Sequence, residues 1–129
     1  MGMYTELIFG ASLKKDTSSQ VINAIKYIVG EIEEKPADFP LSEGRCEWLL
    51  RGSSYYFGVS SPVKKFWQDE ISGEWVLSSR SNIKNYGNEI EEFLDWIKPH
   101  IESGSGIKEM YAMTMYEEQS EPTIYYLED

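Results

Sequence analysis

The chain has 129 residues, of which 41% are hydrophobic and 14% aromatic, and its formal net charge is −10. This composition excludes a disordered chain and suits one globular domain, 1–129, that needs no disulfide or metal to hold its core. The negative charge excludes non-specific binding to nucleic acid, which requires a basic surface. A single cysteine, no signal-like N-terminal pattern and no apolar run of ~18 residues predict a soluble, cytoplasmic protein without a membrane segment.

The first two predicted elements are a strand over 3–13 and a helix that ends near Gly30. The strand is rich in β-formers, with Gly10 as a β-bulge residue. Thr17 and Gln20 fit a capping box at the start of the helix. The apolar residues that recur there at helical spacing are Val21, Ile22, Ile25, Ile28, Val29 and Ile32.

A proline-containing loop over 35–44 leads into the central part of the chain. Residues 46–57 are predicted to form a strand, although neither of its alternating faces is cleanly apolar. Two further strands, 63–68 and 74–81, flank a hairpin signal at Ser72-Gly73.

The last third predicts a helix followed by two strands. Asn88 is expected to cap the helix with Glu91 as its reciprocal partner, and Pro99 to end it near Lys98. Its apolar stripe consists of Ile90, Phe93, Leu94, Ile97 and Ile101. After a glycine-rich joint, residues 107–116 and 123–127 read as strands separated by a turn.

The element order β-α-β-β-β-α-β-β predicts the fold class. Two helices can cover only one face of a mainly antiparallel sheet of five to six strands, which gives a two-layer α+β domain. The sequence leaves the strand order open.

Three phrases of the sequence, RGSSYYF, RSNIKNY followed by EIEEFLDWI, and the ending EPTIYY, carry a resemblance. On these phrases the chain resembles small uncharacterised proteins of phage and prophage type. That group implies no known activity, so the resemblance assigns no site residue.

Charge is distributed unevenly along the chain. Residues 45–88 contain six basic and four acidic residues, whereas 89–129 contain two basic and eleven acidic ones. Our leading hypothesis is a small acidic interaction protein that binds and blocks a more basic partner, as immunity and phage counter-defence proteins do. The predicted contact residues are Glu89, Glu92, Asp95, Glu117, Glu118 and Glu121, with Tyr111, Tyr116 and Tyr125 as exposed anchors.

Two alternatives remain open. If strands 46–57 and 74–81 are neighbours, Arg51, Ser53, Ser78 and Arg80 share one sheet face and form an anion site there, because guanidinium and hydroxyl groups suit a carboxylate or phosphate. The same positions also suit a plain solvent-facing surface. The second alternative is a structural subunit that self-associates as a homo-oligomer through a strand edge, such as that of the last strand.

The chain lacks most of the side-chain groups that enzymes commonly use for catalysis. The chain has one histidine, His100, beside Pro99, and one cysteine, Cys46, which we interpret as a buried apolar side chain. One Cys and one His exclude the usual zinc site within one chain, and neither an EF-hand pattern nor a nucleotide-binding fingerprint occurs. We therefore predict that the protein is not an enzyme and carries no cofactor or metal.

Overall fold

The computed structural model describes residues 4–52, 63–103 and 109–127. Over these residues the chain forms five strands, two α-helices and two short 3-10 helices. In chain order they are β1 (Thr5–Ser12), α1 (Ser19–Val29), η1 (Arg45–Trp48), β2 (Val63–Gln68), β3 (Trp75–Ile83), α2 (Glu89–Ile97), η2 (Lys98–His100), β4 (Met110–Tyr116) and β5 (Thr123–Tyr126).

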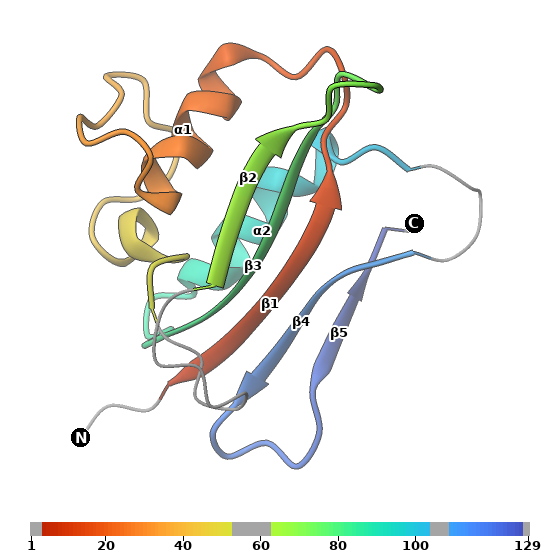
Figure 1. Ribbon diagram of the computed structural model, residues 1–129. Helices are drawn as coiled ribbons and strands as arrows, with labels where there is room; N and C mark the ends of the chain where they lie inside the picture. The colour runs from red at the N-terminus through yellow and green to blue at the C-terminus, as the bar shows by residue number, and fades with distance from the viewer. Residues whose placement is uncertain (1–3, 53–62, 104–108, 128–129) are drawn as a thin grey trace.

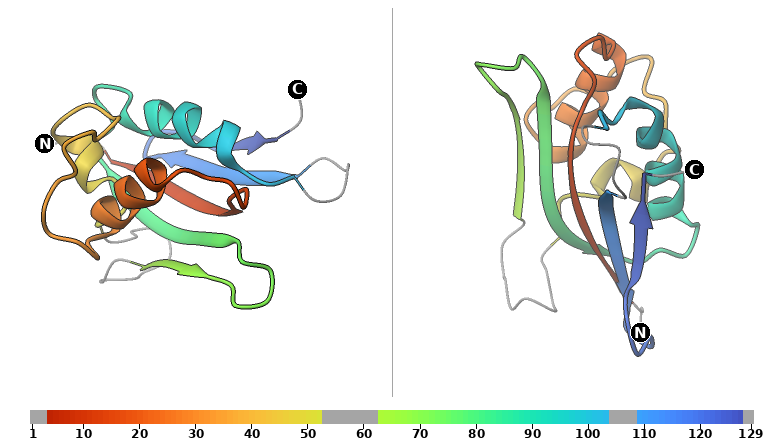
Figure 2. Two further views of the ribbon diagram at one scale, coloured as in Figure 1. Left: turned by 90° about the horizontal axis from the view of Figure 1, so that it is seen from above. Right: turned by 90° about the vertical axis from the view of Figure 1, so that its right-hand side faces the viewer.

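The five strands form one sheet in the order β2-β3-β1-β4-β5, and every neighbouring pair is antiparallel. Both α-helices lie on the same face of this sheet, as the views in Figures 1 and 2 show together. This arrangement confirms the predicted two-layer α+β fold, with β2 and β5 at the two edges of the sheet.

The hydrophobic core lies between the helices and the inner face of the sheet. Alternation along β1 places Leu7 and Phe9 on this face, while the apolar stripes of both helices pack against it. The helix side chains that are 0% exposed are Ala24, Ile25, Ile28, Ile90, Phe93 and Ile97. The predicted stripes therefore mark the core-facing sides of both helices.

The prediction of a strand over 46–57 is wrong for the residues of this segment that the structure describes. Residues 45–48 form η1, and the chain then turns through 49–52; residues 53–62 lie outside the described residues. The buried side chains here are Cys46, Leu49 and Leu50, a spacing of three and four that fits a helical turn. Ser81 of β3 fixes the turn, because its hydroxyl donates to the Leu49 carbonyl at 2.9 Å.

The N-cap of helix α1 lies one residue later than predicted. Ser18, not Thr17, is the N-cap residue, and its hydroxyl accepts from the Val21 amide. The Gln20 side chain donates instead to the Asp38 carbonyl at 2.8 Å. The predicted end is confirmed, since Gly30 follows the helix with φ 90°, a left-handed conformation that glycine adopts without steric cost.

Helix α2 is capped by a different asparagine from the predicted one. Asn88 has φ 59° and makes no side-chain cap. Asn85 accepts from the Ile90 amide at 2.8 Å and donates to the Glu91 carboxylate at 2.8 Å. Asn85 thereby satisfies a helix-start donor and draws the connection between β3 and α2 close to Glu91.

Candidate functional site

A cleft of about 520 Å³ opens between the start of α2 and the β4–β5 hairpin. Three tyrosines and one carboxylate line it, and its other lining residues are threonines and amides. We call it the tyrosine cleft. Its tyrosines and its carboxylate are Tyr86, Tyr116, Tyr125 and Glu91.

Two amide side chains hold the walls of the tyrosine cleft. Asn85 binds Glu91 on the helix side, as described above. On the hairpin side, Gln119 accepts from the Tyr116 amide at 2.7 Å and donates to the Thr123 hydroxyl at 3.1 Å. These contacts lock the β4–β5 turn against its own strands, so the hairpin wall has a fixed shape.

The acidic residues predicted in the β4–β5 turn lie beside the cleft. Glu117, Glu118 and Glu121 are exposed in the turn that also supplies Gln119 to the lining. Glu117 also accepts from the Tyr4 amide at 2.6 Å. The carboxylate that lines the cleft together with the tyrosines is Glu91, and the turn adds exposed acids on the hairpin side.

Two of the predicted contact acids on α2 bind partners within the chain and do not form an open surface. Glu92 accepts from both the amide and the hydroxyl of Ser42, at 2.9 and 3.1 Å. Glu89, whose side chain is 13% exposed, accepts from the Gly87 amide and lies 3.7 Å from the Arg45 guanidinium. Glu89 and Glu92 were predicted as contacts for a partner, but both face chain segments that pack beside α2.

Two further predicted contact residues are not at the cleft. Asp95 is exposed but lines a separate hollow with Lys14 and Lys98. Tyr111 is only 6% exposed, and its ring packs edge-on against Phe9, so the prediction of an exposed anchor there is wrong. Burial raises the pKa of the Tyr111 hydroxyl, and the negative charge of Asp95 acts in the same direction.

The cleft also uses residues that the sequence did not single out. Tyr86 and Asn85 come from the turn NYGN, which reads as an ordinary joint, and Glu91 was assigned to capping. The available signal was a tyrosine in a turn directly before the acidic run EIEE. Tyr116 and Tyr125 were predicted, and both line the cleft.

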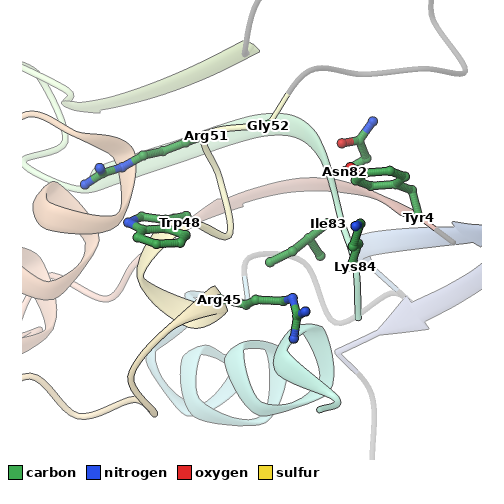
Figure 3. Close-up of a pocket in the computed structure, with 8 residues that line it drawn as sticks. All are labelled: Tyr4, Arg45, Trp48, Arg51, Gly52, Asn82, Ile83 and Lys84. Carbon is green, nitrogen blue, oxygen red and sulfur yellow. The ribbon is translucent and has the colours of Figure 1, made fainter. Parts of the chain in front are cut away.

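The predicted anion-binding face does not form. Ser78 and Arg80 are exposed on β3, but Arg51 follows η1 and is not part of a strand, and Ser53 lies outside the described residues. The Arg51 guanidinium donates to the carbonyls of Tyr27 and Ile28 at the end of α1. Figure 3 shows this side chain directed towards that helix. Arg51 thus satisfies helix-end acceptors that lack partners within the helix.

Cys46 is a buried structural residue, as the sequence predicted. Its side chain is 0% exposed, and its sulfur lies 3.4 Å from the Glu92 carboxylate. Burial raises the pKa of the Cys46 thiol to about 12, and the carboxylates of Glu92 and Glu89 act in the same direction. His100 packs its ring edge-on against Trp96, 6.1 Å between centroids. Within 4–52, 63–103 and 109–127, no three His, Cys, Asp or Glu side chains gather as a metal site.

We predict that Cys46 resists alkylation in the folded protein. A pKa of about 12 leaves about a thousandfold less thiolate at neutral pH than an ordinary thiol, and the sulfur is also enclosed. Iodoacetamide labelling followed by mass spectrometry should show slow modification in buffer and rapid modification in denaturant. Rapid labelling in buffer, with circular dichroism unchanged, would contradict the enclosed thiol.

Comparison of the chain with protein-family models, curated proteins and solved structures finds no match. In the described part of the chain, no helix has the length and apolar character that crossing a bilayer requires.

Proposed function

We propose that the protein binds a more basic protein and blocks it, in the manner of immunity or phage counter-defence proteins. The tyrosine cleft receives a Lys or Arg side chain of that partner. The observation that carries this proposal is the meeting of Glu91 with three tyrosine rings beside the acidic β4–β5 turn.

The charge of the chain supports a basic partner. The net charge is −10, and residues 89–129 hold eleven acidic residues against two basic ones. A field of this sign raises the rate at which a positively charged protein is captured and repels acidic competitors.

The chemistry of the cleft supports a cationic side chain as the inserted group. Tyrosine faces attract a guanidinium or ammonium group within about 6 Å of the ring centroid. The Tyr86 ring already has the Arg45 guanidinium 5.2 Å from its centroid, so Tyr116 and Tyr125 are the rings that an incoming cation would use. The Glu91 carboxylate supplies a charged acceptor within the same cleft, where Asn85 holds it in place. Tyrosine and arginine are also common at the energetic centres of protein interfaces.

A short oligoarginine peptide tests the cleft directly. We expect the peptide to shift the backbone amide resonances of Tyr116, Gln119 and Thr123 in NMR spectra of the protein. Replacing three cleft-side acids, Glu91→Gln, Glu118→Gln and Glu121→Gln, should weaken peptide binding by about tenfold, measured by calorimetry. Glutamine at 91 keeps an acceptor for Asn85, so the wall of the cleft is retained.

The matched control removes three charges elsewhere. Glu31, Glu33 and Glu34 are exposed after α1, and their triple Gln variant has the same net charge as the cleft variant. It should bind the peptide nearly as tightly as the wild type does. Equal weakening by both variants would mean that net charge alone attracts the peptide, and the proposed cleft would be wrong.

Once the cleft is established, the same two variants identify the partner. The tagged wild-type protein should retain a basic protein from its host lysate at low salt and release it as the salt concentration rises. Retention should be lost with the cleft variant and kept with the control variant.

A further inference from the structure

A second hollow, of about 480 Å³, lies on the other side of the connection between β3 and α2. Ile83 and Lys84 line this hollow, whereas the next two residues, Asn85 and Tyr86, line the tyrosine cleft. Figure 3 shows its walls, with Arg45 and Trp48 of η1 on one side and the end of β3 on the other. Its volume falls in the range of about 300–1,000 Å³ that is typical of small-molecule sites.

The hollow is basic in an acidic protein. Three of its eight lining residues, Arg45, Arg51 and Lys84, are cationic, and none is a carboxylate. The Lys84 ammonium lies 5.7 Å from the ring centroid of Tyr4, which also lines the hollow. The Arg45 side chain is 41% exposed, and Glu89 offsets part of its charge from 3.7 Å away. The Arg51 guanidinium is directed away from the hollow and binds the end of α1, so Arg45 and Lys84 are the cations that face a ligand there.

A large aromatic surface stands beside these cations. Trp48 lines the hollow with 58% of its surface exposed, whereas the neighbouring Cys46 and Leu49 are fully buried. An indole held in this way by a short, well-anchored 3-10 helix offers a face on which a planar ring can stack.

At the remaining wall of the hollow, the backbones of Gly52 and Asn82 approach closely, and the Asn82 side chain has an amide nitrogen without a partner among the described residues. A Cβ atom at Gly52 would lie 2.4 Å from the Asn82 carbonyl oxygen, so only glycine permits this approach. Asn82 lines the hollow and is 8% exposed, and its Nδ2 atom has no hydrogen-bond partner.

We propose that this hollow binds a small nucleoside phosphate. The base stacks on Trp48, and the phosphate lies between Arg45 and Lys84. Cationic side chains match phosphate oxygens, and an exposed indole matches the π-face of any base. A free nucleotide fits better than a nucleic acid, because a chain with net charge −10 repels a long polyanion.

Calorimetric titration with adenosine monophosphate, adenosine and inorganic phosphate tests the proposal. The nucleotide should bind at least about tenfold more tightly than either of its parts, because only the nucleotide uses both the indole and the cations. Trp48→Ala and Lys84→Met should each weaken nucleotide binding by about tenfold or more. Both side chains are solvent-accessible, so the variants should keep the wild-type circular dichroism spectrum.

The open face of the sheet offers a matched control. Lys65 lies 4.7 Å from the ring centroid of Trp67 on β2, a cation–aromatic pair that does not line the hollow. Trp67→Ala and Lys65→Met should leave nucleotide affinity unchanged. Absence of nucleotide binding, equal affinity for inorganic phosphate, or unchanged affinity in both Trp48→Ala and Lys84→Met would overturn the proposal. The two sites share no lining residue, but Arg45 of the hollow lies over the Tyr86 ring of the cleft, 5.2 Å from its centroid. Trp48→Ala and Lys84→Met alter neither of these two side chains, so the nucleotide result can be told apart from the oligoarginine result.

Discussion

Phe93→Ala should lower the free energy of unfolding by about 4 kcal/mol, which is a large part of the stability of a typical small domain. Phe93 is 0% exposed at the middle of α2, where the helix packs on the sheet. Its ring meets Phe9 of β1 edge-on, with 5.6 Å between centroids, and Trp96 at 6.0 Å. The change leaves a cavity between the helix and the central strand and removes a favourable aromatic pair. Urea denaturation followed by circular dichroism measures the loss.

Phe93→Leu is the matched control for this prediction. Leucine keeps most of the buried apolar volume, so the loss should be less than half that of alanine. If both substitutions cost the same, or if alanine costs under about 1 kcal/mol, Phe93 does not hold α2 on the sheet in the way described.

Glu47→Gln should lower the free energy of unfolding by about 1 to 2 kcal/mol at neutral pH. The Glu47 carboxylate accepts from the Gly44 amide at 2.9 Å, the Tyr27 hydroxyl at 2.8 Å and the Lys35 ammonium at 3.3 Å. It therefore joins η1 to α1 and to the loop between them. A glutamine side chain has one acceptor oxygen in place of two, so at least one donor loses its partner. The carboxylate is 15% exposed, and water compensates part of the loss.

The effect of Glu47→Gln should depend on pH. The Gly44 amide, and then the Tyr27 hydroxyl, hold the pKa of Glu47 below its ordinary value of 4.5. A lowered pKa in the folded state means that the unfolded state takes up the proton first. The stabilisation is thus present above pH 4.5 and is lost as the pH falls through the lower, folded-state pKa.

Urea denaturation at pH 7 and at pH 3 measures this dependence. The difference between the wild type and Glu47→Gln should shrink at the lower pH. The control is Glu43→Gln, because Glu43 also lies near Lys35, at 3.6 Å, but its side chain is 87% exposed. That variant should differ little from the wild type at either pH. A Glu47→Gln difference that stays constant between the two pH values would contradict the ionised hydrogen-bonded carboxylate.

The helices and most strands of this protein were predictable because each has a local repeat. Ile25 and Ile28 recur at helical spacing and are fully buried, and alternation along β1 places Leu7 and Phe9 in the core. The predicted strands over 63–68 and 74–81 correspond to β2 and β3. The end of α1 at Gly30 was predictable for a similar reason, because glycine adopts the left-handed conformation that closes a helix.

The prediction for the segment after Gly44 was wrong because its apolar residues fit both the two-residue repeat of a strand and the 3.6-residue repeat of a helix. Cys46, Leu49 and Leu50 are compatible with a strand that has mixed faces and with one turn of a helix. Ser81 and Arg51 decide between them, since their hydrogen bonds to the Leu49 carbonyl and to the end of α1 fix a turn. The predicted anion site depended on the strand, so it was lost with it.

The candidate site was predicted only in part, for a related reason. Two of the predicted contact residues, Tyr116 and Tyr125, line the tyrosine cleft. Glu89 and Glu92 bind partners within the chain, because Arg45 and Ser42 lie beside the helix, which spacing along the helix does not reveal.

The class of this fold, the core-facing side of each helix and the concentration of negative charge in the last third are all visible in the amino-acid sequence. The strand order β2-β3-β1-β4-β5, the internal partners of the acids and the position of Glu91 in one cleft with Tyr116 and Tyr125 became visible only in the folded chain. The two groups of features differ in the range of the interactions that produce them. A repeat of two or 3.6 residues is visible within one short window, whereas strand register and the contacts between distant segments depend on how whole layers pack.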